Sequence, residues 1–240
     1  MRRVLAQARV EVTLTLRRGE TLLVTMIIPV GILLFFSVVD VLPHTTRQAV
    51  DFLVPGVLAL ALISTGMVSL GIATGFERQA GVLRRLGVTP LGRAGLLAAK
   101  TSSVVLIEIL QWAAIFACAL ALGWRPAFAS PAAVGGLWLL GTAAFAGIGF
   151  TLAGRLRAEA NLGVANGLFL GLLLLGGIIV PVSRLPGPLR ALTRALPAEP
   201  LATSLRTVLE GGAPEGRALV VLGAWAAGAC ALAALTFRWD

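Results

Sequence analysis

Few side chains in this sequence can carry out chemistry. The 240 residues include two cysteines, one histidine and no tyrosine, and charged residues make up 13% of the chain. Cys118 and Cys230 lie far apart inside apolar stretches, which favours buried apolar residues over a disulfide or a metal pair. His44 has no clustered cysteine or acidic partner, so we expect no metal site.

Several catalytic and nucleotide-binding motifs are also absent. The sequence has no Gly-x-Ser-x-Gly motif, no Ser–His pair within an apolar run and no aspartate pair spaced to hold magnesium and a diphosphate. It also lacks Gly-x-x-x-x-Gly-Lys-Ser/Thr, the loop that holds the phosphates of ATP. We therefore expect that the chain is not an enzyme and that it has no catalytic residues and binds no cofactor of its own.

Long apolar runs make up most of the sequence. Hydrophobic residues account for 58% of the chain, and the mean hydropathy is +0.92. Runs of about twenty apolar residues can cross the roughly 30 Å of a bilayer's hydrocarbon, where they must be helical because every backbone polar group needs an internal partner. We predict an all-α polytopic membrane protein with a single transmembrane domain over 1–240. Its six predicted transmembrane helices cover 21–39, 52–75, 95–122, 134–152, 162–180 and 218–237.

The net charge of +9 comes almost wholly from arginine, since Lys100 is the only lysine. The arginines lie in the breaks between apolar runs and form no single face, so membrane topology explains them better than nucleic acid, which we do not expect as a partner. With both termini cytoplasmic, the inner side receives thirteen basic residues and the outer side seven. This bias predicts a multi-pass membrane protein with both termini cytoplasmic.

Residues 1–20 form a different kind of segment. Leu5, Ala8, Val12 and Leu16 recur at helical spacing, and charged residues occupy the other faces. Such a helix can lie in the membrane interface, with its apolar face in the acyl boundary and its arginines on lipid phosphates. The pattern predicts an interfacial amphipathic helix that anchors the chain to membrane lipid or holds a partner, and both roles stay open.

Residues 77–90 form a charged amphipathic segment where a membrane protein needs only a short loop. Val82, Leu83 and Leu86 fall within one helical stripe, and glycines and a Thr-Pro pair bracket a short helix. The predicted topology places this segment on the cytoplasmic side. We expect that it docks a partner in the water phase.

Polar residues occur inside the third predicted span. Thr101, Glu108 and Gln111 lie near one face of that helix. An unpaired charge near the middle of a span costs at least about 2.5 kcal/mol, so this stripe should face the bundle interior. It is a candidate lining for a transport path, or a set of hydrogen-bonding groups that hold helices together.

A glycine repeat marks the fifth predicted span. Gly163, Gly167 and Gly171 recur every four residues, and Asn166 joins them. Small residues at this spacing let two helices approach closely. The repeat is a candidate dimer interface or a packing face within the chain.

The segment 181–216 follows the fifth predicted span and is rich in proline and leucine. Prolines cut it into short pieces, and leucines recur at helical spacing between them. We predict two short amphipathic helices that lie on the outer surface or re-enter it.

In their places among six spans, these segments resemble the permease subunits of type-2 ATP-binding-cassette (ABC) exporters, the group that includes bacterial drug and antibiotic efflux permeases. The resemblance covers nearly the whole chain. It is most specific in Glu77-Arg78-x-x-Gly81-Val82-Leu83-x-x-Leu86-x-x-Thr89-Pro90 and in Leu185-Pro186-Gly187-x-Leu189-Arg190, followed by Leu196-Pro197-x-x-Pro200-Leu201.

The resemblance implies roles for these positions. Segment 77–90 would contain a cytoplasmic coupling helix that fits a groove on an ATPase subunit, residues 1–20 would be a connecting helix that also touches the ATPase, and the first and fifth spans would form the dimer interface. The implied ATPase-coupling residues are Glu77, Arg78, Gly81, Val82, Leu83, Leu86 and Pro90. The implied outer-gate residues are Leu185, Pro186, Leu189, Pro197 and Pro200. The chain departs from the family at Val82, where threonine is frequent, and at Ala198-Glu199, where an apolar or aromatic residue is commoner.

The implied transporter complex has two membrane halves, identical or homologous, and two copies of a separate ABC ATPase subunit that binds ATP and Mg. It would export an amphiphilic substrate, such as a drug, an antibiotic, a lipid or a lipid-linked molecule, across the bacterial plasma membrane. Two alternatives stay open: a proton-coupled secondary transporter that uses Glu108, and a non-transporting scaffold or substrate-capture subunit.

Overall fold

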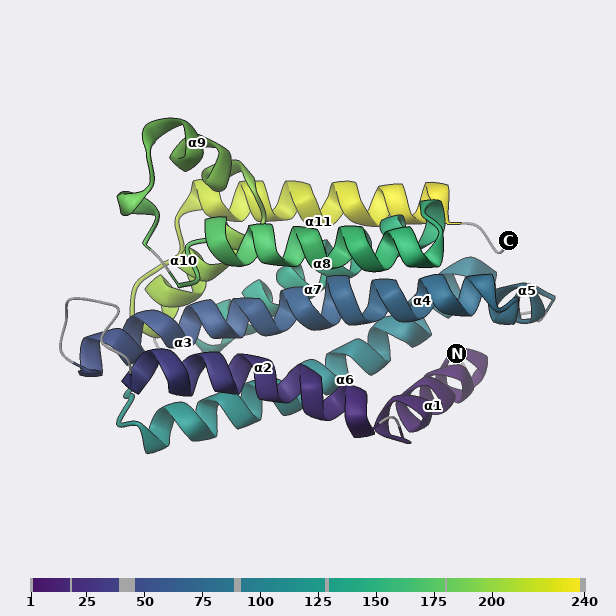
Figure 1. The fold of residues 1–240 in the computed structure, drawn as a ribbon, viewed down its shortest axis with the longest axis horizontal. Helices are drawn as coiled ribbons and strands as arrows, with labels where there is room; N and C mark the ends of the chain where they lie inside the picture. Colours follow the sequence, from purple (N-terminus) through teal and green to yellow (C-terminus); the bar gives the residue numbers. More distant parts are fainter. Residues whose placement is uncertain are drawn as a thin grey trace.

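The computed structural model describes residues 2–17, 19–38, 46–88, 92–127, 130–179 and 181–237, and within these ranges the chain is helical and has no strand. Long helices run side by side in an elongated bundle (Figure 1). The elements are α1 (Arg2–Arg17), α2 (Gly19–Val38), α3 (Thr46–Leu62), η1 (Ile63–Ser69), α4 (Leu70–Gln79), α5 (Val82–Gly87), α6 (Gly92–Ala121), α7 (Pro131–Arg155), α8 (Ala158–Leu175), η2 (Val182–Arg184), α9 (Gly187–Ala195), α10 (Ala198–Leu209) and α11 (Gly216–Thr236).

Helices long and apolar enough to cross a membrane correspond to five of the six predicted spans. They are Ala49–Gln79, Gly95–Ala121, Pro131–Arg155, Ala158–Leu175 and Gly216–Thr236. The first predicted span corresponds to α2, in which the apolar helix found among the described residues, Thr25–Ser37, is shorter. The structure therefore confirms an all-helical chain with five candidate spans, while the sixth stays a prediction.

The second and fifth spans differ most from the predicted boundaries. The second span continues to Gln79 and does not end at residue 75. The fifth helix begins at Ala158 and ends at Leu175, earlier at both ends than 162–180. Gly177 adopts a left-handed φ of 67°, which closes the end of this helix, and Val180 lies outside the described residues.

The central element is the continuous helix formed by α3, η1 and α4. The middle of α3 is fully buried, and η1 is a seven-residue π-helix. α4 and η1 lie against α7 at glycines: a Cβ placed on Gly149 would meet the carbonyl oxygen of Gly66 at 2.7 Å, and one on Gly71 would meet that of Gly149 at 3.1 Å. Side chains are excluded at this contact because the two backbones approach so closely.

The short helices gather at opposite ends of the bundle (Figure 1). α1, α5 and the last turn of α11 lie at one end, and α9 and α10 lie at the other. α9 protrudes from its end, whereas α10 lies among α3, α7 and α11 with most of its residues buried. The described residues of segments 1–20 and 77–90 thus share one end, and segment 181–216 occupies the other.

Candidate functional site

The corner between α4 and α5 is built around Gly81. This glycine has a left-handed φ of 72°, which L side chains rarely adopt, and a Cβ there would meet no atom within 4 Å. Its N–H donates to the Arg78 carbonyl at 3.0 Å, and its own carbonyl accepts from the N–H of Arg85 at 3.3 Å. The backbone conformation that only glycine adopts easily therefore allows the chain to turn from α4 into α5.

α5 has one face on the protein and one face in solution. Leu83 is 0% exposed and belongs to an apolar cluster that includes Leu96 and Phe150, and Leu86 packs against the same cluster. Arg84 and Arg85 are exposed on the other side. Leu83 and Leu86 of the predicted stripe therefore hold α5 onto the helix bundle, whereas Val82 does not.

The outward surface of α5 is made of different residues from the predicted stripe, of which it contains only Val82. Val82 is 39% exposed, and Val88, just beyond the helix, is 87% exposed. Together with Arg84 and Arg85 they form a basic and apolar surface at the tip of the bundle. Neither arginine belongs to the predicted coupling residues. Pro90, also predicted as a coupling residue, lies outside the described residues.

Side chains in the last turn of α4 form hydrogen bonds or ion pairs with the α7–α8 turn, with α8 and with α6. Arg78 Nη2 donates to the carbonyl oxygen of Leu156, in the turn between α7 and α8, at 2.6 Å. Gln79 Nε2 donates to Oε1 of Glu159, in the first turn of α8, at 2.9 Å. A third tie runs from Glu77 to Lys100 on α6. The corner that carries α5 is therefore fixed to α6 and to the α7–α8 turn.

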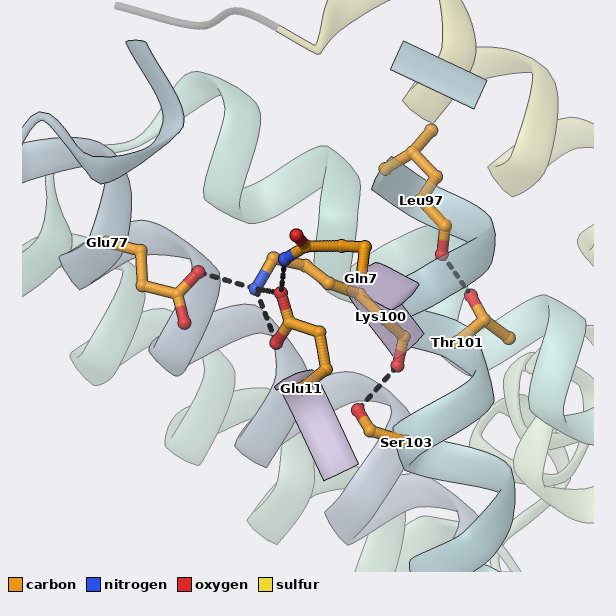
Figure 2. A network of polar contacts seen from close by, with 7 residues as sticks. All are labelled: Gln7, Glu11, Glu77, Leu97, Lys100, Thr101 and Ser103. Atoms are coloured by element: carbon orange, nitrogen blue, oxygen red, sulfur yellow. Dashed lines mark hydrogen bonds and ion pairs between the residues drawn. The ribbon is translucent and has the colours of Figure 1, made fainter. Parts of the chain in front are cut away.

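Lys100 joins three elements at this end of the bundle (Figure 2). Its ammonium forms ion pairs with Glu77 of α4 and with Glu11 of α1, the latter at 3.2 Å. Gln7 Nε2 also donates to Oε1 of Glu11 at 3.0 Å. The sequence analysis selected neither Lys100 nor Glu11 as a site residue, because no spacing pattern links residues on separate helices.

Glu108, from the predicted polar stripe, contacts α7. Its residue is 0% exposed, and its Oε2 accepts hydrogen bonds from Trp138 Nε1 at 3.0 Å and Thr142 Oγ1 at 2.6 Å. Its Oε1 has no hydrogen-bond partner among the described residues. The carboxyl thus joins α6 to α7, while its part in a transport path stays a prediction.

The other two members of the stripe have different partners. Gln111 accepts a hydrogen bond from Thr65 of η1 at 2.8 Å and donates to the Thr25 carbonyl of α2 at 2.9 Å. Thr101 donates to the carbonyl of Leu97 within its own helix at 2.9 Å (Figure 2). Glu108 and Gln111 therefore connect α6 to different helices.

The glycine repeat of α8 faces away from the other described helices. A Cβ placed on Gly163, Gly167 or Gly171 would meet no atom of the described residues within 4 Å. Asn166 is exposed, and its amide donates to the carbonyl of Leu162 in the same helix at 2.8 Å. This surface is available to a second chain, and the dimer interface stays a prediction.

The predicted gate residues lie on both short helices at the other end. Pro197 and Pro200 are buried at the start of α10, Leu185 is partly buried, and Pro186 and Leu189 at the start of α9 are exposed. The structure describes these positions without assigning a gate.

Arg206 fixes α10 to its neighbours. Its Nη2 donates to the carbonyl oxygens of Phe52 at 3.2 Å and Gly177 at 3.3 Å, and its guanidinium lies 3.9 Å from the Phe52 ring centroid. Burial lowers the pKa of Arg206 to about 10, so the group stays charged at neutral pH. Burial raises the pKa of Glu199, in the first turn of α10, above its usual range.

The apolar helices and the polar ties at both ends describe a multi-pass helical membrane protein. The chain belongs to the ABC-2 type transporter family, whose model matches residues 3–209, and this confirms the resemblance found in the sequence. It is 25% identical over 219 residues to the Bacillus subtilis (strain 168) protein named "Putative transport permease YvfS", a match that covers 90% of this chain and 89% of that protein. The family and this relative support a membrane permease subunit, which is a transport component. The family also implies an ABC ATPase as partner.

Proposed function

We propose that this chain is the membrane-spanning half of an ATP-driven exporter. Six transmembrane helices with both termini cytoplasmic would move an amphiphilic drug, antibiotic, lipid or lipid-linked molecule across the bacterial plasma membrane. The observation that carries the proposal is α5: a short helix anchored by buried Leu83 that presents Val82, Arg84 and Arg85 at the tip of the bundle. A helix held in this way suits docking into a groove on an ABC ATPase.

The proposed mechanism is mechanical. Two ATPase subunits bind ATP and Mg and close on each other, and this closure moves the α5 helices seated in them. The ties of Glu77, Arg78 and Gln79 would carry that movement into α6 and the α7–α8 turn. The membrane halves would rock between two packed states, and hydrolysis would reset the cycle.

A second membrane half, identical or homologous, would complete the path. The open surface of Gly163, Gly167 and Gly171 supports pairing through α8, because small residues permit close helix contact. Thr101, Glu108 and Gln111 remain the candidates for lining the path. Leu185, Pro186, Leu189, Pro197 and Pro200 remain the candidates for its outer gate.

Co-purification tests the proposed function. The chain is expressed together with its neighbouring genes, solubilised and captured, and an ABC ATPase is expected to come with it. Reversing the charge of α5 with Arg84→Glu and Arg85→Glu should abolish capture, because both side chains lie on the proposed docking surface. Arg155→Glu is the control, since Arg155 is an exposed arginine on α7 and outside that surface. Equal capture with the α5 double variant would overturn the proposed role of α5, and no capture by the parent would overturn the function.

A second candidate is a proton-coupled transporter, which the buried carboxyl of Glu108 favours. This alternative gives α5 no task. Proton flux measured with a pH-sensitive dye in vesicles that contain the chain alone separates the two functions, because only the proton-coupled transporter moves protons without an ATPase.

A further inference from the structure

Lys100 is the only lysine in the chain, and it lies where a free ammonium would be costly. Its residue is 2% exposed, and both of its ion-pair partners are carboxylates (Figure 2). Burying an ammonium without a partner costs several kcal/mol, so pairing is necessary. One carboxylate would balance the charge. The structure supplies two, from different elements.

The two carboxylates belong to segments that are far apart in the sequence. Glu11 lies in α1, and Glu77 lies in the last turn of α4, directly before the corner that leads to α5. Lys100 lies on α6 between them, and α1 packs along α6. The ammonium is therefore a direct polar link from α1 to the base of α5.

Lysine suits this link better than arginine. An ammonium is a compact charge with three donors that rotate freely, so it can serve two carboxylates that approach from different directions. The planar guanidinium of arginine instead matches one carboxylate in a two-pronged pair. In a chain whose other basic residues are all arginine, lysine stands where two carboxylates meet.

A small cavity lies beside the charged cluster of Lys100, Glu11 and Glu77. It has a volume of about 50 Å³. Besides the three charged residues, its lining includes the polar Thr65, Ser69 and Ser103 and the apolar Leu14, Leu70, Ala73, Val104 and Ile107. This volume is large enough for a water molecule, and the polar side chains of the lining offer hydrogen-bond partners for one. Water there would solvate the excess formal negative charge of two carboxylates against one ammonium.

We propose that Lys100 is a positioning residue that makes α1 and the α4–α5 corner move as one body. The inference rests on the proposed function for what drives the movement, but the tie itself exists without an ATPase. A docked α5 would then shift α1 along the membrane surface together with α4, through Glu77, Lys100 and Glu11.

The distance between α1 and α5 tests the tie in the chain alone. In a background of Cys118→Ala and Cys230→Ala, nitroxide labels are placed at Arg9→Cys and Arg85→Cys, since both arginines are exposed. The labelled chain is studied in lipid nanodiscs without an ATPase, by pulsed electron paramagnetic resonance. We expect a narrow distance distribution in the parent and a broader one, shifted to longer distance, in Lys100→Met. The distribution in Lys100→Arg should be intermediate in width between these two.

A triple variant separates positioning from simple charge balance. Lys100→Met with Glu11→Gln and Glu77→Gln removes all three charges of the cluster together. The variant should therefore insert into the membrane, and its unfolding temperature should be near that of the parent. We expect its distance distribution to stay broad, because the link is gone. A narrow distribution in the triple variant or in Lys100→Met would overturn the proposal. Arg155→Met, which removes an exposed cation at the same end, should leave the distribution narrow.

Failure of this proposal and failure of the proposed function give different results. If the ATPase does not co-purify but Lys100→Met broadens the distance distribution, Lys100 links α1 to the α4–α5 corner although the proposed ATPase partner is wrong. If the ATPase binds and the distribution never broadens, the function stands and Lys100 has no positioning role.

Discussion

The carboxyl of Glu108 shows how one buried residue depends on its neighbours. Trp138 and Thr142 both donate to its Oε2, so the side chain connects α6 to α7. A buried donor left without a partner costs about 1–3 kcal/mol. The geometry accounts for the residue as a link between helices without requiring that it move protons.

Replacing Glu108 tests this role. Glu108→Gln keeps an oxygen that accepts both hydrogen bonds, so it should lower the free energy of unfolding by no more than about 1 kcal/mol, whereas Glu108→Ala strands both donors and should cost about 3 kcal/mol. Thermal unfolding of the solubilised chain measures the difference. Equal losses in the two variants would contradict the link. Loss of proton flux in Glu108→Gln alone would favour the proton-coupled transporter.

The buried carboxyl of Glu199, at the start of α10, should make the stability of the chain depend on pH. Burial raises the pKa of Glu199 above its ordinary 4.5, so the fold favours the neutral carboxyl. The stability that this group contributes is fully present below about pH 4.5 and is lost as the pH rises through the raised pKa. Glu199→Gln should therefore unfold at a higher temperature than the parent at pH 8, and the gap should shrink toward pH 4. The exposed Glu210→Gln is the control. A gap that does not change with pH would contradict the effect of burial.

At the scale of the element, two adjacent residues of α5 have opposite surroundings, and only one of them should hold the helix in place. Leu83 is 0% exposed and Val82 is 39% exposed, although they are adjacent in the sequence. Leu83→Ala should cost about 2–5 kcal/mol of local stability because it leaves a cavity, and Val82→Ala should cost little. Amide hydrogen exchange across Val82–Gly87 measures this, with faster exchange expected only for Leu83→Ala. Equal exchange rates would show that α5 is not held by Leu83.

The sequence predicted elements better than it predicted partners. Gly81 and the amphipathic stripe indicated the short helix α5, and the prolines near 186 and 197 indicated where α9 and α10 begin. These signals are local, because they reflect backbone conformation and the period of a helix. The link from Glu11 to Lys100 joins residues 89 positions apart, so no local pattern could reveal it.

At the scale of the whole molecule, α8 presents the open glycine surface. Gly167→Leu should weaken pairing of two membrane halves, because a large side chain would separate helices that approach through glycine. Cysteine cross-linking between α8 helices in membranes measures this. Gly228→Leu on α11 is a matched control, since a Cβ at Gly228 also meets nothing within 4 Å. Unchanged cross-linking in Gly167→Leu would show that pairing uses another surface.

The sequence by itself determined the membrane class, the long apolar helices and the short helices at Gly81 and at the prolines. Hydrocarbon demands long helices with satisfied backbones, and glycine and proline fix local conformation, so both leave a pattern in the chain order. Only the tertiary structure decided that Leu83 faces inward, that the glycines of α8 face outward and that Lys100 joins Glu11 to Glu77. These features depend on which helices lie side by side, and that arrangement results from packing across the whole bundle.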